Sequence, residues 1–194
     1  VGAGISGILA AKNAAKNNLK TLLVDEKNEL GGATIYQNRE FNKIENQSSS
    51  DWIKKEIEEL KNLKNLEIKT RTSVAAFHGY NYLLARENLT DHLEKKEKQG
   101  KIRQRLLKIR AKKVILATGA LERPLIFNNN DRPGIMLSSA VKKYADFYGV
   151  VSGKKNVFFT NNDSAYESAL CLHNKGIKVE AVIDIRENSG SKII

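Results

Sequence analysis

The sequence of 194 residues predicts an α/β fold with a mostly parallel sheet, and two observations support this prediction. A glycine-rich turn at residues 2–7 precedes apolar residues at helical spacing, and the continuous apolar run 21–24 then indicates a strand buried on both faces. A second strand–helix–strand pattern follows from residue 155. Alternating strands and helices are typical of a parallel sheet covered by helices.

The remaining elements are predicted from periodicity and capping. The first helix is expected to end near Asn17 and Asn18, because asparagine tolerates the left-handed conformation at helix ends. Residues 28–50 are predicted to be mostly loop, and Ser50 to cap a helix that runs to residue 63. Strand-like runs predict a small antiparallel excursion that returns to the main sheet: 66–70, 73–77, 80–86, 105–109 and 114–117. Further along we expect a turn at 132–134, helices at 138–148 and 164–174, and strands at 157–160 and 179–184.

The composition excludes several classes of protein. A single cysteine, Cys171, rules out an intrachain disulfide, a CxxC redox pair or a cysteine-based zinc site, which is consistent with a cytoplasmic protein. No apolar run reaches the ~18–20 residues of a membrane helix, so we expect no membrane partner. The net charge is +11, but the dense basic stretch 95–113 has no interleaved aromatic residue. A solvated face is therefore favoured over nucleic-acid binding.

Gly2, Gly4 and Gly7 form the pattern GxGxxG between a strand end and a helix. In that context Gly2 makes a tight turn, Gly4 lets a diphosphate approach the backbone, and Gly7 lets helix and strand pack closely. The free N–H groups at the start of the helix favour an anion. Asp25 follows Gly7 by 18 residues, where a carboxylate would accept hydrogen bonds from the adenosine ribose. The alternative is a glycine-rich turn with no ligand.

Asp25, Glu26 and Lys27 also bear on the choice of dinucleotide. An arginine near the ribose would accommodate the 2′-phosphate of NADP, and none follows closely. NAD or FAD is therefore favoured over NADP, although Lys27 weakens this inference. The glycine pattern does not separate NAD from FAD.

Two further glycine-containing segments are candidates for contact with the cofactor. Gly31 and Gly32 offer a close backbone approach, and small residues end the predicted strand at 114–117. Either segment could instead be a simple tight turn. With the first motif they define the candidate cofactor-binding set: Gly2, Gly4, Ile5, Ser6, Gly7, Asp25, Glu26, Lys27, Gly31, Gly32, Ala33, Thr34, Val74, Ala117, Thr118 and Gly119.

Apart from this candidate cofactor-binding set, the sequence shows no set of catalytic or metal-binding residues. Residues 161–164 occupy the place of a second glycine fingerprint but contain no glycine, so Asn162 or Asp163 is expected to cap a helix at a degenerate site. Cys171 lies on the apolar face of the predicted helix 164–174, which favours a buried structural thiol over a nucleophile. The three histidines are scattered. We therefore expect a cofactor binder without its own reaction centre.

These motifs predict two domains. Residues 1–150 are expected to form an FAD/NAD-type dinucleotide-binding domain, with a truncated first strand and an antiparallel excursion at about 66–113. Residues 151–194 are expected to begin a second, incomplete Rossmann-like strand–helix–strand unit.

Three segments resemble flavin and pyridine-nucleotide oxidoreductases with two dinucleotide-binding domains: GAGISG at 2–7, VDEKNELGG at 24–32 and VILATGA at 114–120. A narrower resemblance is to the α subunits of heterotetrameric sarcosine oxidases. It covers ATGALERPLIFNNNDRPGIMLSSAVKKY at 117–144 and VFFTNNDSAY at 157–166, together with TDHLEKKE at 90–97 and RQRLLKIRAKKVILATGA at 103–120.

The narrower resemblance implies a function. Such an oxidase demethylates sarcosine to glycine, with hydrogen peroxide and a one-carbon unit passed to tetrahydrofolate. It implies NAD in this α-subunit segment, on Gly2, Gly4, Gly7 and Asp25, while FAD, FMN and tetrahydrofolate are expected elsewhere in a complex with β, γ and δ subunits. Sarcosine itself would be handled outside this segment. The alternatives are an FAD-binding subunit of a related amine or amino-acid dehydrogenase, and a non-catalytic nucleotide-binding scaffold.

Overall fold

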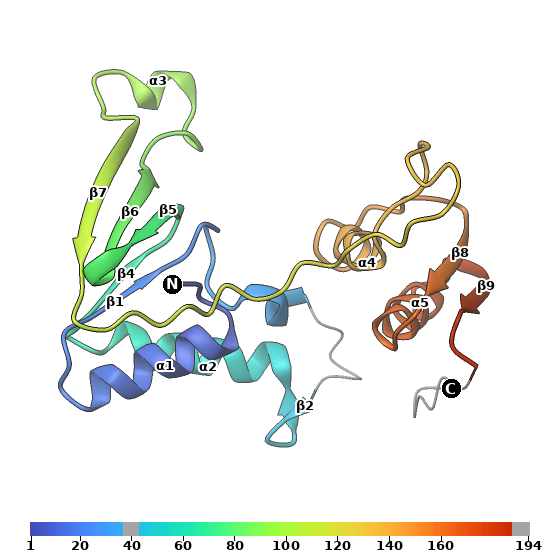
Figure 1. The fold of residues 1–194 in the computed structure, drawn as a ribbon, viewed down its shortest axis with the longest axis horizontal. Coiled ribbons are helices and arrows are strands. Elements are labelled where there is room, and N and C mark those ends of the chain that lie inside the picture. The colour runs from blue at the N-terminus through green and yellow to red at the C-terminus, as the bar shows by residue number, and fades with distance from the viewer. Residues whose placement is uncertain (37–42, 188–194) are drawn as a thin grey trace. The chain divides into compact units, whose positions relative to one another are not determined.

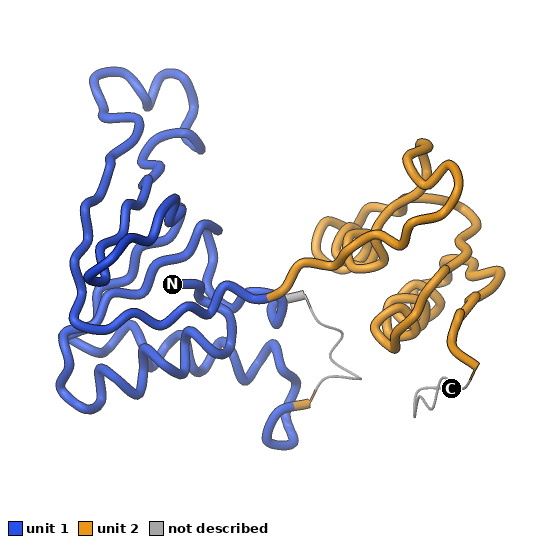
Figure 2. The backbone as a smooth tube through the Cα atoms, in the orientation of Figure 1, with its two compact units in different colours: residues 1–35, 44–119 blue, residues 36–43, 120–194 orange. Residues whose placement is uncertain are grey.

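The computed structural model describes residues 1–36 and 43–187. The chain divides into two compact units, residues 1–35 with 44–119 and residues 36–43 with 120–194 (Figure 2). Each unit has its own cluster of buried apolar side chains. The contacts thus divide the chain after Gly119, and a domain boundary at residue 150 stays a prediction.

The first unit begins with the predicted glycine turn, helix and strand (Figure 1). The strand end predicted before the turn is not present as a strand, because residues 1–3 have no regular secondary structure. Helix α1 (Ile5–Lys16) follows the glycine turn and is capped by Asn17, and Asn18 then takes the left-handed conformation with φ of 61°. Strand β1 (Thr21–Val24) pairs in parallel with β4 (Leu66–Lys69). The sequence places residues 66–70 in the antiparallel excursion, and this is wrong for residues 66–69.

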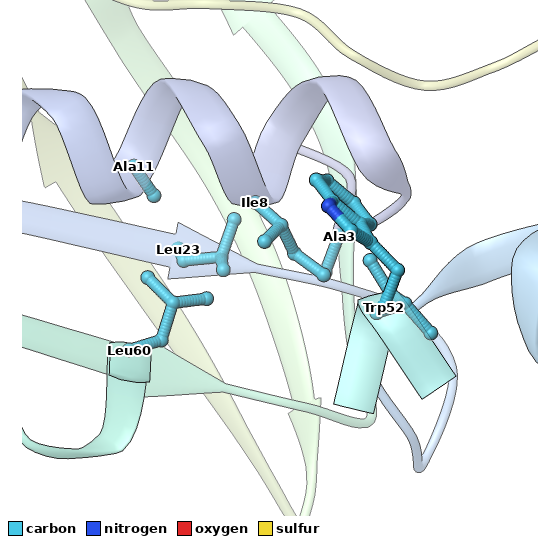
Figure 3. Packing of buried hydrophobic residues seen from close by; sticks show 7 residues of the cluster. Ala3, Ile8, Ala11, Leu23, Trp52 and Leu60 are labelled. Atoms are coloured by element: carbon cyan, nitrogen blue, oxygen red, sulfur yellow. The ribbon is translucent and has the colours of Figure 1, made fainter. Parts of the chain in front are cut away.

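Helix α2 (Ser49–Lys61) packs against α1. Its N-cap is Ser48, whose hydroxyl accepts a hydrogen bond of 3.1 Å from the backbone N–H of Asp51, so the predicted cap at Ser50 is two residues too late. Apolar side chains from the turn, both helices and β1 form the core of the unit (Figure 3): Ala3, Ile8, Ala11, Leu23, Trp52, Ile53 and Leu60. This core fixes the glycine turn against the sheet.

The antiparallel excursion is a three-stranded sheet in the order β5-β6-β7. Its strands are β5 (Thr72–His78), β6 (Tyr82–Asn88) and β7 (Gln104–Arg110), with the short helices η2 (Gly79–Asn81) and α3 (Lys95–Lys98) between them. Residues 114–117 are not a strand, contrary to the sequence prediction. The segment is nevertheless joined to the start of the glycine turn by two hydrogen bonds, from Val1 N to Ile115 O and from Ala117 N to Val1 O.

The predicted loop at residues 28–50 contains short elements. A 3₁₀ helix, η1 (Gly32–Tyr36), follows β1, and the two-residue strands β2 (Lys43–Ile44) and β3 (Gln47–Ser48) precede α2. The part of this loop at residues 37–42 lies outside the described residues.

The second unit contains the predicted second strand–helix–strand pattern. Strands β8 (Lys155–Thr160) and β9 (Lys178–Asp184) are parallel and are connected through α5 (Ser164–Asn174). Helix α4 (Ser138–Phe147) packs against α5. The buried cluster of this unit comprises Ala145, Phe158, Ala165, Ala169 and Leu172. The predicted α/β class, with an antiparallel excursion and a second βαβ unit, is therefore confirmed. Among the described residues, no helix has the length and apolar character needed to cross a bilayer.

Candidate functional site

The glycine turn leads directly into the N-terminus of α1. Gly2 has a φ of +92°, and its N–H donates a hydrogen bond of 2.8 Å to the carbonyl of Val24 at the end of β1. Gly4 is the N-cap residue and has an extended backbone, and the N–H of Ile8 donates the first helical hydrogen bond to its carbonyl. Within the described chain, no side chain caps α1 and its first turn carries no acidic residue. The first-turn N–H groups are therefore available to an anion.

The three glycines of the motif have different surroundings. A Cβ on Gly2 would collide with the carbonyl oxygen of Ala117, and a Cβ on Gly7 would collide with the carbonyl oxygen of Gly2. A Cβ on Gly4 would meet no described atom within 4 Å. Gly2 and Gly7 are thus required by packing of the protein on itself, while Gly4 borders open space at the helix N-terminus. This is the arrangement expected where a diphosphate approaches the backbone.

Asp25 lies just beyond the end of β1 and is hydrogen-bonded to the turn. Its Oδ2 accepts a hydrogen bond of 2.5 Å from the N–H of Ala3, and its Oδ1 accepts one of 2.8 Å from the N–H of Lys27. Each carboxylate oxygen has a second lone pair, so both can also accept a hydroxyl. Asp25 therefore fixes the turn and keeps the capacity to bind a ribose. The side chain of Glu26 is exposed, and that of Lys27 is half-buried.

The second glycine pair lies against the first motif. The N–H of Gly31 donates a hydrogen bond of 2.7 Å to the carbonyl of Ala3, and Gly31 has a φ of +114°. A Cβ on Gly32 would lie 2.9 Å from the Cα of Gly4. In the following 3₁₀ helix Ala33 is exposed, whereas Thr34 is buried. The pair thus forms one wall beside Gly4.

The segment 117–119 lies behind the turn. Ala117 is the residue that faces both Gly2 and Gly7, since its Cβ would lie 3.4 Å from a Cβ on Gly7. Thr118 and Gly119 are exposed, and Gly119 has a φ of +77°. Ala117 therefore supports the turn itself, which sequence reasoning did not identify. Contact of Thr118 and Gly119 with a cofactor stays a prediction.

The remaining candidate cofactor-binding residues are Ile5, Ser6 and Val74. Ile5 is half-buried and Ser6 is exposed, and both are in the first turn of α1. Val74 lies on β5, where it pairs with Ala85. The N–H of Thr72, two residues before Val74, donates a hydrogen bond of 2.8 Å to the carbonyl of Asp25, which connects β5 to the site. Sequence reasoning did not single out Ala3 or Thr72, because both act through backbone N–H groups.

The single cysteine is not positioned for catalysis. Cys171 is buried in the second unit, and its thiol donates to the carboxylate of Asp146 at 3.1 Å. Burial, together with the adjacent carboxylate, raises the pKa of this thiol to about 12, so it is protonated at neutral pH. This confirms the prediction of a buried structural thiol. No group of three His, Cys, Asp or Glu side chains that could hold a metal ion occurs among the described residues.

Comparison with known proteins connects this geometry to a family. The family model described as "Pyridine nucleotide-disulphide oxidoreductase" matches residues 1–182. The chain is 41% identical over 186 residues to "Sarcosine oxidase subunit alpha" of Corynebacterium sp. (strain P-1), which covers 96% of this chain and 19% of that protein. It is 34% identical over 190 residues to the protein of the same name in Rhizobium meliloti (strain 1021), covering 98% of this chain and 19% of the relative.

A solved structure is also similar. The crystal structure of L-proline dehydrogenase from P.horikoshii matches with a TM-score of 0.72 and 25% sequence identity, over 97% of this chain and 36% of that chain. The present chain therefore spans about a fifth of the length of its sarcosine oxidase relatives and about a third of the matched structure.

Proposed function

The chain belongs to the pyridine nucleotide-disulphide oxidoreductase family, and from this premise we propose that it is the dinucleotide-binding segment of a sarcosine oxidase α subunit, with NAD at the Gly2–Gly7 turn. The observation that supports this proposal most strongly is the open space beside Gly4 at the N-terminus of α1. Gly2 and Gly7, on either side of it, are packed too closely to accept a Cβ. The similarity to two sarcosine oxidase α subunits supports the choice of parent enzyme.

The site fits an adenine dinucleotide. Its diphosphate would accept hydrogen bonds from the first-turn N–H groups of α1, at the positive end of the helix dipole. The adenosine ribose would donate to Asp25 or to the exposed Glu26. Gly32 would border the diphosphate, because its backbone lies against Gly4. Bound NAD supplies a ring that can accept or donate a hydride, and the residues described here orient its adenosine diphosphate half.

The two carboxylates favour NAD over NADP. Asp25 and Glu26 are consecutive at the end of β1, where the 2′ position of the adenosine ribose would lie. A 2′-phosphate would meet the two negative charges of these side chains there. NADP is therefore disfavoured by like-charge repulsion.

The amine oxidation itself is assigned to other parts of the enzyme. Among the described residues there is no metal cluster, and the one thiol is buried and protonated. We propose that sarcosine, FAD, FMN and tetrahydrofolate are bound elsewhere in a cytoplasmic heterotetramer with β, γ and δ subunits.

A second candidate is supported by the solved structure that resembles this chain. That structure is of an L-proline dehydrogenase, so the site at the Gly2–Gly7 turn could instead hold FAD in a subunit of a related amine or amino-acid dehydrogenase. A non-catalytic scaffold is a third reading of the same site, in which the nucleotide is only structural.

The identity of the bound nucleotide tests the proposal. The complete α subunit is purified in its complex, the segment's nucleotide is released by denaturation, and the extract is separated and its absorption recorded. One equivalent of NAD beyond the flavins of the other subunits supports the proposal. An extra equivalent of FAD in its place would support the dehydrogenase subunit, and no extra nucleotide would contradict both.

A further inference from the structure

The second strand–helix–strand unit repeats the layout of the first one. Asp163 is the N-cap residue of α5, as Gly4 is of α1. Asp184 ends β9, and Asp25 directly follows the last residue of β1, so each unit places a carboxylate at the end of the strand that follows its helix. In open parallel sheets this edge, at the carboxyl ends of the strands, is where nucleotides bind.

In the second unit this edge is filled by a side chain of the protein. The guanidinium of Arg186 bridges the two carboxylates, with Nη2 at 2.7 Å from Asp163 Oδ1 and 2.6 Å from Asp184 Oδ2. Its Nε donates to both oxygens of Asp184, at 3.0 and 3.2 Å, and its backbone N–H donates to Oδ1 at 3.0 Å. The hydroxyl of Tyr166 in α5 donates to Oδ2 of Asp184 at 3.1 Å. Asp184 therefore has little acceptor capacity left for a ribose.

The turn before α5 also lacks the features that admit a diphosphate. Where Gly4 leaves open space at the helix N-terminus, the second unit places the carboxylate of Asp163, whose charge would repel a phosphate. The side chain of Asn162 accepts hydrogen bonds from the N–H and hydroxyl of Ser164, at 3.0 and 2.6 Å. A first-turn N–H that would otherwise face an anion is thus already satisfied by the protein.

We propose that Arg186 takes the place of a nucleotide in the second unit, so that this unit binds none and is instead held together by its own ion pairs. In a dinucleotide-binding unit the ligand connects the glycine turn to the acidic residue at the end of the next strand. Here the guanidinium makes the same connection, from Asp163 to Asp184, without a ligand. Arg186 is therefore a positioning residue for the turn at 161–163, and the proposal does not depend on which nucleotide the first unit holds.

Photolabelling of the complete enzyme tests whether the second unit binds a nucleotide. The α subunit in its complex is irradiated with 8-azido-NAD, digested, and the labelled peptides are identified by mass spectrometry. We expect no label between residues 155 and 186 that excess NAD can displace. A displaceable label in that range would overturn the proposal. We expect the displaceable label within residues 1–35. Its absence there would contradict the function proposed for the first unit, so the two failures are distinguishable.

Hydrogen exchange tests whether the ion pairs of Arg186 hold the turn at residues 161–163. Arg186→Gln removes the charge and both bridging contacts, so amide exchange at residues 160–165 should become roughly tenfold faster, with no gain in bound nucleotide. The control is Arg123→Gln, which changes an exposed arginine of the same unit. Equal exchange in the two variants would overturn the role of Arg186.

Discussion

The backbone N–H of Ala3 donates a hydrogen bond of 2.5 Å to Oδ2 of Asp25, across 22 residues of sequence. This bond joins the glycine turn to the end of β1, and the carbonyl of the same Ala3 accepts from the N–H of Gly31 at 2.7 Å. The backbone of one residue beside the proposed diphosphate position is thus held on both its N–H and its carbonyl side. Asp25 consequently acts on a nucleotide in two ways, through its free lone pairs and through the turn that it fixes.

Replacing Asp25 by Asn should weaken nucleotide binding. The amide has one acceptor oxygen where the carboxylate uses two, so the N–H of Ala3 or of Lys27 would face an NH₂ group. Losing one charge-assisted hydrogen bond corresponds to ~1.5–3 kcal/mol, or roughly a 10- to 140-fold rise in the Kd for NAD. Calorimetric titration of the nucleotide-free complex measures the change. Glu26→Gln, at the exposed neighbouring carboxylate, should have a smaller effect, and equal effects would contradict the dual role of Asp25.

Two alanine substitutions should separate packing from binding within the motif. Gly7→Ala places a Cβ against the carbonyl of Gly2, where only backbone can give way, so it should lower the free energy of unfolding by about 1–3 kcal/mol. Gly4→Ala places its Cβ in open space and should leave the melting temperature nearly unchanged. Thermal unfolding of the two purified proteins makes the comparison. Equal loss of stability would mean that Gly4 is also a packing residue.

The glycine motif and the acidic residue were predictable from sequence, because both are local patterns with a fixed spacing. The position of Ala117 behind Gly2 and Gly7 was not, since that contact joins residues more than a hundred positions apart. The pairing of β4 was missed for a related reason. The run 66–70 is strand-like in either sheet, and only its distant partner β1 decides that residues 66–69 belong to the parallel one. At α2 both Ser48 and Ser50 are acceptable caps, and local sequence does not distinguish them.

The ion pairs between α1 and α2 should make stability depend on pH. Lys12 Nζ lies 2.6 Å from Glu56 Oε2 and 2.7 Å from Glu59 Oε2. Hydrogen bonds to these glutamates raise the pKa of Lys12 above its ordinary 10.5, and the hydrogen bond from Lys12 lowers the pKa of Glu59 below 4.5. The stabilisation should therefore be full between these two values. It should be lost as the pH falls through the lowered pKa of Glu59 or rises through the raised pKa of Lys12.

Comparison with Lys12→Met isolates this effect. The wild-type protein should melt at a higher temperature than the variant from about pH 5 to pH 10, and the difference should shrink toward both extremes. A difference that stayed constant across acidic pH would show that the glutamates do not contribute through their charge.

The thiol of Cys171 should be unreactive in the folded protein. Its pKa is raised to about 12 by burial, so the thiolate is scarce at pH 8. Titration with a disulfide reagent at pH 8 should therefore find no rapidly reacting thiol from this segment until denaturant is added. Rapid labelling of Cys171 in the native enzyme, located by peptide mapping, would contradict the buried structural role.

The nucleotide content of a Gly4→Val enzyme tests the central claim most directly. A valine side chain at Gly4 would fill the open space at the N-terminus of α1 while meeting no described atom with its Cβ, so the fold should be kept and the diphosphate excluded. Gly79→Val is the matched control, because Gly79 also borders open space without a positive φ but lies in the excursion. We predict that Gly79→Val retains a full equivalent of NAD, whereas Gly4→Val, with an unchanged melting profile, retains less than about a tenth. Full occupancy in the Gly4→Val enzyme would contradict the assignment of this turn as the nucleotide site.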